Sequence, residues 1–111
     1  MAKYIMLKIL KIYSNKFYQT NMYSIDYTNK FKKDIKLCKK RGYDIQKIKK
    51  AIEFLENDGQ VPENYLPHKL HGKLSEYWDC HIEPDWLLIY KIEDTIKLVT
   101  LVRTGTHSDI L

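Results

Sequence analysis

The chain has 111 residues, 44% of them hydrophobic, with a formal net charge of +5 and two cysteines. This length fits one domain with one modest core, and two cysteines are too few for a disulfide-stapled secreted scaffold. No apolar run is long enough to cross a bilayer, so we expect a cytoplasmic protein without a membrane partner.

The charge is distributed unevenly along the chain. Residues 30–50 carry ten basic and two acidic side chains, whereas residues 51–111 carry five basic and eleven acidic ones. A basic block on a small protein indicates a polyanionic partner, most often nucleic acid. It is also typical of a solvated helix face, and charge by itself does not separate the two interpretations.

Residues 1–21 differ from the rest of the chain. They contain four lysines but no acidic residue, glycine or proline. Their apolar residues have helical spacing, and Met22 can itself serve as a start. We interpret them as an N-terminal extension, either an additional helix or the product of a mis-called start. Residues 22–111 then form the single remaining domain.

This domain is predicted to begin with a strand and two helices. The stretch YSIDY (23–27) alternates apolar and polar residues as a strand does. Thr28 caps the first helix and Gly42 ends it, while Asp44 caps the second and the Asn-Asp-Gly run at 57–59 closes it. Lysines occupy the faces that the apolar residues leave, which predicts a helical hairpin with a basic outer side.

The second half is predicted to be a loop followed by three strands. Prolines and a glycine interrupt residues 60–72. Period-two alternation or continuous apolar character then predicts strands over 77–83, 86–92 and 96–102, joined by tight turns. Because helices and strands are segregated, the fold class is α+β. We expect the N-terminal strand and basic helical hairpin to pack on a small antiparallel sheet, with a three-strand meander at the C-terminal end.

Several residues suited to chemistry lie near the ends of these strands. The tight turn after Glu83 is expected to bring His81 and Asp85 close together, with Asp79 as a neighbour. Arg103 ends the last strand, and the glycine two residues later lets the chain turn and present His107 near that guanidinium.

This residue set suits metal-free cleavage of RNA. Histidine titrates near neutrality and can accept or donate a proton, while arginine presents a planar fork of donors to phosphate oxygens. One group removes the proton of the 2′-hydroxyl, another protonates the leaving 5′ oxygen, and the cation stabilises the charge on phosphorus. DNA has no 2′-hydroxyl and cannot react in this way.

Simpler interpretations stay open for the same residues. His68 lies in a loop, where polar residues without function are common. Arg103 can be a salt-bridge partner of Asp85 or Glu83. Trp86 is more typical of a core or sheet-face aromatic than of a base-stacking platform.

A zinc site is the main alternative in terms of chemistry. His68, His71, Cys80 and His81 are eligible ligands, but their spacing matches no common zinc-finger pattern. We therefore predict no metal site and no cofactor.

Three segments together point to a known family. The run YWDCHIEPDWLLIY (77–90), followed by RTGTHSDIL (103–111), resembles the YafQ toxins of bacterial type II toxin–antitoxin systems, within the RelE/ParE superfamily. The loop LPHKLHGKL (66–74) and the lysine-rich hairpin are also similar. The resemblance covers about residues 22–111.

The resemblance implies a RelE/ParE-like toxin domain that is an mRNA endoribonuclease, or mRNA interferase. Such toxins enter the A site of the 70S ribosome, next to 16S rRNA, and cut the mRNA there without metal. They leave a 2′,3′-cyclic phosphate and a 5′-hydroxyl. A cognate antitoxin of the DinJ/RelB type holds them silent.

The resemblance also assigns roles by position. His68, His81, Asp85 and His107 match proton-transfer residues, and Arg103 matches an arginine that faces the phosphate. We expect His107 to be the general acid, His81 and Asp85 to form the base side, and His68 to assist. Which of these groups takes the first proton stays open.

Supporting roles follow in the same way. Asp79 matches an acidic residue that supports the site, Trp86 matches the tryptophan next to the catalytic aspartate, and Leu111 falls where relatives have a phenylalanine that helps to place the mRNA. The hairpin lysines are expected to bind ribosomal RNA phosphates: Lys32, Lys36, Lys39, Lys40, Lys47 and Lys50.

Two other functions stay open at this point. ParE-type toxins of the same superfamily bind DNA gyrase and are not nucleases, although a protein-binding inhibitor has no use for clustered histidines. An inactive module that keeps only the contact with its antitoxin is the other alternative, and Leu111 is its only indication.

Overall fold

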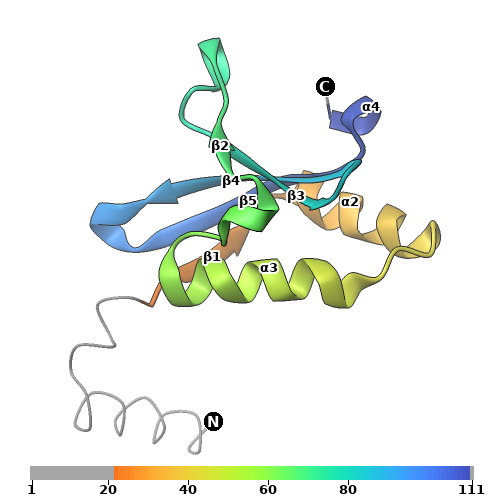
Figure 1. Cartoon of the computed structure of the whole chain (residues 1–111), viewed down its shortest axis with the longest axis horizontal. Helices are drawn as coiled ribbons and strands as arrows, with labels where there is room; N and C mark the ends of the chain where they lie inside the picture. The colour runs from red at the N-terminus through yellow and green to blue at the C-terminus, as the bar shows by residue number, and fades with distance from the viewer. Residues whose placement is uncertain (1–21, 111) are drawn as a thin grey trace, which may run out of the picture.

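The computed structural model describes residues 22–110 (Figure 1). The proposed N-terminal extension, residues 1–21, and Leu111 lie outside the described residues. The helices and strands are β1 (Ser24–Tyr27), α2 (Asn29–Lys40), α3 (Ile45–Asp58), β2 (His68–Lys69), β3 (Trp78–Glu83), β4 (Trp86–Glu93), β5 (Leu98–Gly105) and α4 (His107–Ile110). Short 3-10 turns lie at Glu63–Tyr65, Gly72–Leu74 and Asp94–Ile96.

Local capping determines where the helical hairpin begins and ends. The Thr28 hydroxyl accepts a hydrogen bond from the Phe31 amide (3.0 Å), and the Asp44 carboxylate accepts one from the amide two residues later (3.0 Å). Gly59 ends α3 in the left-handed region, with a φ of 71°, and a Cβ there would lie 2.4 Å from the Tyr23 ring. These contacts confirm the predicted hairpin.

The five strands form one sheet in the order β1-β5-β4-β3-β2. Strands β3, β4 and β5 form the predicted antiparallel meander. The sheet is nevertheless mixed rather than wholly antiparallel, because β1 pairs parallel with β5. The residue pattern of β1 could not reveal this pairing, since its partner lies at the other end of the chain.

Two further features of the structure were not predicted. Strand β2 lies within the segment expected to be a loop, and it is too short for its residues to show alternation. Strand β5 runs to Gly105 instead of ending at residue 102, so Arg103 lies within the strand and α4 follows it directly. As a result, His68 and Arg103 lie on strands and His107 begins a helix, instead of lying in loops.

The core lies between the sheet and the hairpin. Helix α3 runs along one side of the sheet, while the loop that carries β2 and the helix α4 project from the other side (Figure 1). Burying one large apolar side chain stabilises the fold by about 1.5–3 kcal/mol. The largest fully buried apolar residues of this core are Ile48, Leu55, Trp86, Leu88, Tyr90 and Val99. No helix within residues 22–110 has the length and apolar character needed to cross a membrane.

Candidate active site

A row of residues in register crosses the sheet. His68 on β2 lies opposite Asp79 on β3, Asp79 lies opposite Ile89 on β4, and Ile89 lies opposite Arg103 on β5. Directly opposite residues of antiparallel strands point to the same face. Ile89 lies outside the core under the helices, so this row belongs to the open face. The sheet thus places an imidazole, a carboxylate and a guanidinium on one surface.

Asp79 is a buried carboxylate beneath the histidines, with the residue only 5% exposed. Its Oδ1 lies 3.0 Å from Nδ1 of His68 but makes no aligned hydrogen bond. Burial raises the pKa of Asp79, and positive charge on His68, His81 and His107 opposes that increase. One carboxylate therefore lies within electrostatic range of three imidazoles.

His107 pairs with Asp85. Its Nδ1 donates to Oδ1 of Asp85 (2.5 Å), and the same oxygen accepts the backbone N–H of His107 (3.1 Å). The hydrogen bond from the His107 side chain is the main reason that the pKa of Asp85 is lowered. The rings of His81 and His107 lie 6.0 Å apart between centroids, so both face one space.

The expected pairing of His81 with Asp85 is corrected by these contacts. The turn does place the two residues near each other in the chain, but the β3–β4 register shifts between His81 and Glu83. His81 instead directs Nδ1 to the Pro84 carbonyl (3.2 Å), and Asp85 binds His107. Helix α4 was not foreseen, and it is the element that brings His107 to Asp85.

All three histidines have Nδ1 engaged by an acceptor. The acceptors are the Leu66 carbonyl for His68 (3.2 Å), the Pro84 carbonyl for His81 (3.2 Å) and the Asp85 carboxylate for His107. A carbonyl or carboxylate only accepts, so Nδ1 carries the proton in each ring. Nε2 is then the nitrogen that each imidazole can offer to a substrate.

Arg103 is held by Asp34 of α2. Its Nε donates to Oδ2 of Asp34 (2.7 Å) and its Nη2 donates to Oδ1 (3.2 Å), which raises the pKa of Arg103. Oδ2 also accepts the backbone N–H of Thr104 (3.0 Å). Within residues 22–110, Nη1 has no hydrogen-bond partner. The guanidinium is therefore fixed on one edge and available to an anion on the other.

Sequence reasoning missed Asp34 as a site residue. The expected alternative, a salt bridge from Arg103 to Asp85 or Glu83, is wrong, because Glu83 binds Lys47 instead (2.9 Å). Asp34 lies 69 residues from Arg103 in the chain. Its only signal in the sequence is that it is an acid within a lysine-rich helix.

A second ion pair holds α4 in place. Arg41, at the end of α2, donates from Nη1 to Oδ2 of Asp109 (2.6 Å) and from Nη2 to Oδ1 (3.1 Å), and these bonds lower the pKa of Asp109. Oδ2 also accepts the Thr106 backbone N–H (2.9 Å). We call this contact the α4 latch. It fixes the short helix whose first residue is His107, and sequence reasoning missed it as well.

Comparison with known proteins places the chain in a family. A family model described as "Bacterial toxin of type II toxin-antitoxin system, YafQ" matches residues 23–111. The chain belongs to the YafQ family. The predicted resemblance is thereby confirmed over nearly all of the domain.

Individual YafQ relatives agree with this assignment. The "mRNA interferase toxin YafQ" of Escherichia coli (strain K12) is 44% identical over 85 residues, which cover 76% of this chain and 90% of the relative. The crystal structure of the E. coli DinJ-YafQ toxin-antitoxin complex is similar with a TM-score of 0.74 and 41% identity, over 81% of this chain and 98% of that one. A metal-bound toxin from Helicobacter pylori also has a TM-score of 0.74, with 35% identity over 81% of this chain and all of that one. These likenesses confirm the α+β, RelE/ParE-like fold.

Trp86 does not contact solvent in this YafQ-family chain. The residue is 1% exposed, its indole N–H donates to Oγ1 of Thr104 (2.9 Å), and its ring packs on Tyr43 at 4.8 Å between centroids. This position agrees with the interpretation as a core aromatic. Its burial excludes direct contact of the Trp86 side chain with mRNA in this conformation, and its hydrogen bond to Thr104 connects it to β5.

The residues of the alternative zinc site do not converge. Cys80 is fully buried in the core under the helices, where burial raises its pKa to about 12. His81 faces the opposite side of the sheet, and His71 is exposed in the loop. Within residues 22–110, no three histidine, cysteine or acidic side chains are grouped so as to hold a metal ion.

The hairpin lysines line the outer side of α2 and α3. All six that were expected to bind ribosomal RNA are exposed: Lys32, Lys36, Lys39, Lys40, Lys47 and Lys50. Lys47 differs from the others because Glu83 already neutralises its charge.

Proposed function

We propose that this chain is the toxin of a type II toxin–antitoxin pair and cuts mRNA on the ribosome by metal-free acid–base chemistry. The observation that carries the proposal is the convergence of His68, His81 and His107 around Asp79, with Arg103 in register on the same face. The name of the E. coli relative, mRNA interferase toxin, supports mRNA as the substrate. Residues 22–111 form the toxin domain in this proposal.

The cleavage step needs one proton acceptor and one proton donor. The 2′-oxygen attacks phosphorus as its proton passes to one imidazole, and the bond from phosphorus to the 5′-oxygen breaks as a second imidazole protonates that oxygen. The products are a 2′,3′-cyclic phosphate and a 5′-hydroxyl. No atom or electron has to come from a cofactor.

The Nδ1 partners support a division of the two proton-transfer tasks between the histidines. Asp85 is a carboxylate and stabilises the charged ring of His107, so His107 is the general acid. The Nδ1 partner of His81 is the Pro84 carbonyl, a neutral acceptor that leaves the Nε2 lone pair free, so we assign His81 as the general base. Asp85 therefore acts on the acid side rather than the base side, and His68 assists from β2.

Arg103 stabilises the charge that develops on phosphorus. Asp34 fixes the guanidinium before substrate arrives, so that Nη1 needs no reorganisation during the reaction. Preorganised donors of this kind are usually the largest single contribution to catalysis of charge-developing steps.

The partners follow from the same proposal. The exposed lysines bind phosphates of 16S rRNA at the A site of the 70S ribosome, which places the protein in the cytoplasm. A cognate antitoxin of the DinJ/RelB type silences the toxin, as supported by the DinJ-YafQ complex of E. coli.

The test is cleavage of mRNA on purified ribosomes that carry a P-site tRNA and an empty A site. We expect wild-type protein to cut in the presence of EDTA and to leave the same mRNA intact when ribosomes are absent. His107→Ala should lower the rate by about 10²–10⁴-fold. Its unfolding midpoint should stay unchanged, because the side chain is 51% exposed.

Three results would contradict the proposed function. Growth arrest by a folded His107→Ala protein would show that the assigned chemistry is wrong. Loss of activity in EDTA, restored by a divalent cation, would contradict the metal-free mechanism. Inhibition of DNA gyrase with mRNA left intact would favour the ParE-like function instead.

A further inference from the structure

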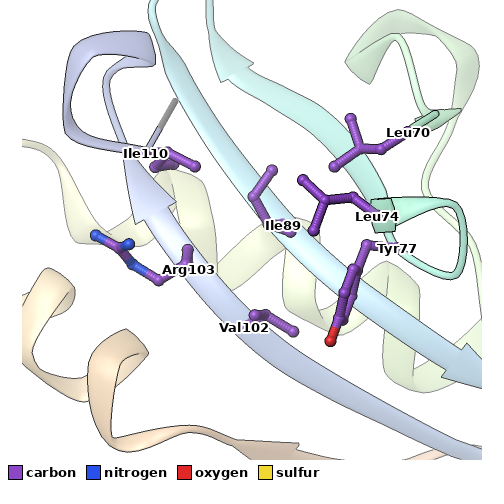
Figure 2. Close-up of a pocket in the computed structure, with 7 residues that line it drawn as sticks. All are labelled: Leu70, Leu74, Tyr77, Ile89, Val102, Arg103 and Ile110. Atoms are coloured by element: carbon purple, nitrogen blue, oxygen red, sulfur yellow. The ribbon is translucent and has the colours of Figure 1, made fainter. Parts of the chain in front are cut away.

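An apolar pocket of about 210 Å³ opens on the face of the sheet that carries the histidines. It lies between the loop that follows β2 and the helix α4 (Figure 2). Its walls come from four elements that are distant in sequence: Leu70, Leu74, Tyr77, Ile89, Arg103 and Ile110. The Leu74 wall is 45% exposed, so an apolar surface here stands open to solvent.

The pocket is continuous with the proposed active site. Tyr77 lies one residue before β3 and two residues before Asp79 in the chain, and it lines the pocket together with Ile89. Two residues of a strand span about 7 Å. Ile89 and Arg103 line the pocket and also stand in register with Asp79. Arg103 is thus shared by the pocket and the histidine cluster.

The chemistry of the walls points to a nucleobase. A base is flat and stacks on aromatic rings, and it remains attached to a phosphate that needs a cation. Tyr77 supplies a ring, and Leu74 and Ile110 supply apolar walls, while Arg103 lies on the β5 side of the pocket with its guanidinium directed away from Tyr77 (Figure 2). Pockets for drug-sized ligands usually measure about 300–1,000 Å³, so this smaller one suits a group of the size of one base rather than a peptide helix.

We propose that this pocket holds the mRNA base next to the scissile phosphate and that Tyr77 is the residue on which the base stacks. The inference rests on the proposed function and deepens it. With the base held in the pocket, the phosphate that follows it lies at Arg103 and the ribose lies toward the histidines. The pocket therefore contributes to the choice of cleavage position.

The test compares variants of Tyr77 on ribosome-bound mRNAs that differ in one base beside the cut. We expect Tyr77→Leu to lower kcat/KM by about ten-fold, as loss of one base–aromatic stack predicts. It should also flatten the preference among the four bases at that position. Tyr77→Phe, which keeps the ring, should restore both rate and preference. Ile96→Ala serves as the control for loss of an exposed apolar side chain, because Ile96 is 63% exposed in the turn before β5.

An abasic nucleotide gives an independent readout of the same contact. In wild-type protein, removing the base beside the cut should slow cleavage by about as much as Tyr77→Leu does. Combining the two changes should cost little more than either alone, since both remove one contact. If Tyr77→Leu does not fold, as judged by its unfolding midpoint, Leu74→Ala at the exposed wall replaces it, with a loss of about three-fold expected.

Three outcomes would overturn the inference. One is an unchanged rate and base preference in folded Tyr77→Leu. Another is fully additive loss with the abasic mRNA. The third is weaker binding of the antitoxin with normal cleavage, which would assign the pocket to an antitoxin segment. A wild-type protein that does not cut ribosome-bound mRNA would instead refute the proposed function itself, so the two failures are distinguishable.

Discussion

The two faces of the sheet differ in whether their buried polar groups are hydrogen-bonded. Under the helices, Trp86 donates to the Thr104 hydroxyl (2.9 Å), which in turn donates to the Leu87 carbonyl (2.6 Å). On the open face, Asp79 is buried with no aligned hydrogen bond to its Oδ1. Satisfied buried polar groups stabilise a fold, whereas an unsatisfied buried charge destabilises it. In the proposed function, the covered face serves stability and the open face serves chemistry.

Among substitutions outside the histidines themselves, the largest expected effect concerns how the helix side of the sheet positions residues on the open face. Asp109→Asn removes the charge of the α4 latch but keeps its shape, so α4 and His107 should lose their fixed position. A displacement of about 1 Å can lower the rate by about 100-fold. We expect kcat to fall by about ten-fold to 100-fold in the ribosome assay, with KM little changed.

The control and the rescue distinguish positioning from general damage. Asp58→Asn alters an exposed carboxylate at the end of α3 and should leave kcat unchanged. Reversing both charges, with Arg41→Asp and Asp109→Arg together, should recover part of the lost rate. Equal kcat in Asp109→Asn and wild type would contradict the proposal that the α4 latch positions His107.

A smaller effect is expected from Asp79→Asn, and it acts in opposite directions on activity and stability. Burial raises the pKa of Asp79 above 3.8, so the folded chain binds this proton more tightly than the unfolded chain. The ionised form therefore lowers stability above the folded pKa, and this loss disappears as the pH falls toward 3.8. The variant should unfold a few degrees higher than wild type at pH 7 and at the same temperature at pH 3.

Activity should change the other way in Asp79→Asn. The carboxylate favours positive charge on the imidazoles around it, which the proposed mechanism puts on His107 before the reaction and on His81 after it, so its removal should slow cleavage by about ten-fold. Thermal unfolding followed by circular dichroism at the two pH values, together with the ribosome assay, measures both changes. A variant that is less stable than wild type at pH 7 would show that the Asp79 carboxylate stabilises the fold, as the hydrogen-bonded polar groups under the helices do.

The smallest effect is expected on the outer side of the hairpin. Lys39→Gln should reduce the slope of log affinity for ribosomes against log salt by about one, since it removes one phosphate contact. Lys47→Gln should reduce that slope less, because Glu83 lies 2.9 Å from the ammonium group and already neutralises it. Equal slopes for the two variants would contradict the proposal that Lys39 binds an rRNA phosphate while the charge of Lys47 is neutralised by Glu83.

The site was only partly predictable. His68, His81, Asp85, Arg103 and His107 were all named from the sequence, and the structure brings them onto one face. Their pairing was not predictable, because Asp85 binds His107 across 22 residues of chain rather than its near neighbour. Trp86 was also named from the sequence, but its side chain is buried in the core, where it packs against other side chains and cannot contact RNA.

The sequence by itself determined what depends on near neighbours. Caps such as Thr28 and Asp44, the two helices and the meander follow from periodicity and from hydrogen bonds that reach only a few residues. Only the tertiary structure decided the parallel pairing of β1 with β5, the salt bridge from Arg103 to Asp34 and the α4 latch. These contacts join segments far apart in the chain. Their energy depends on how the core assembles, and that information is not contained in any local pattern of residues.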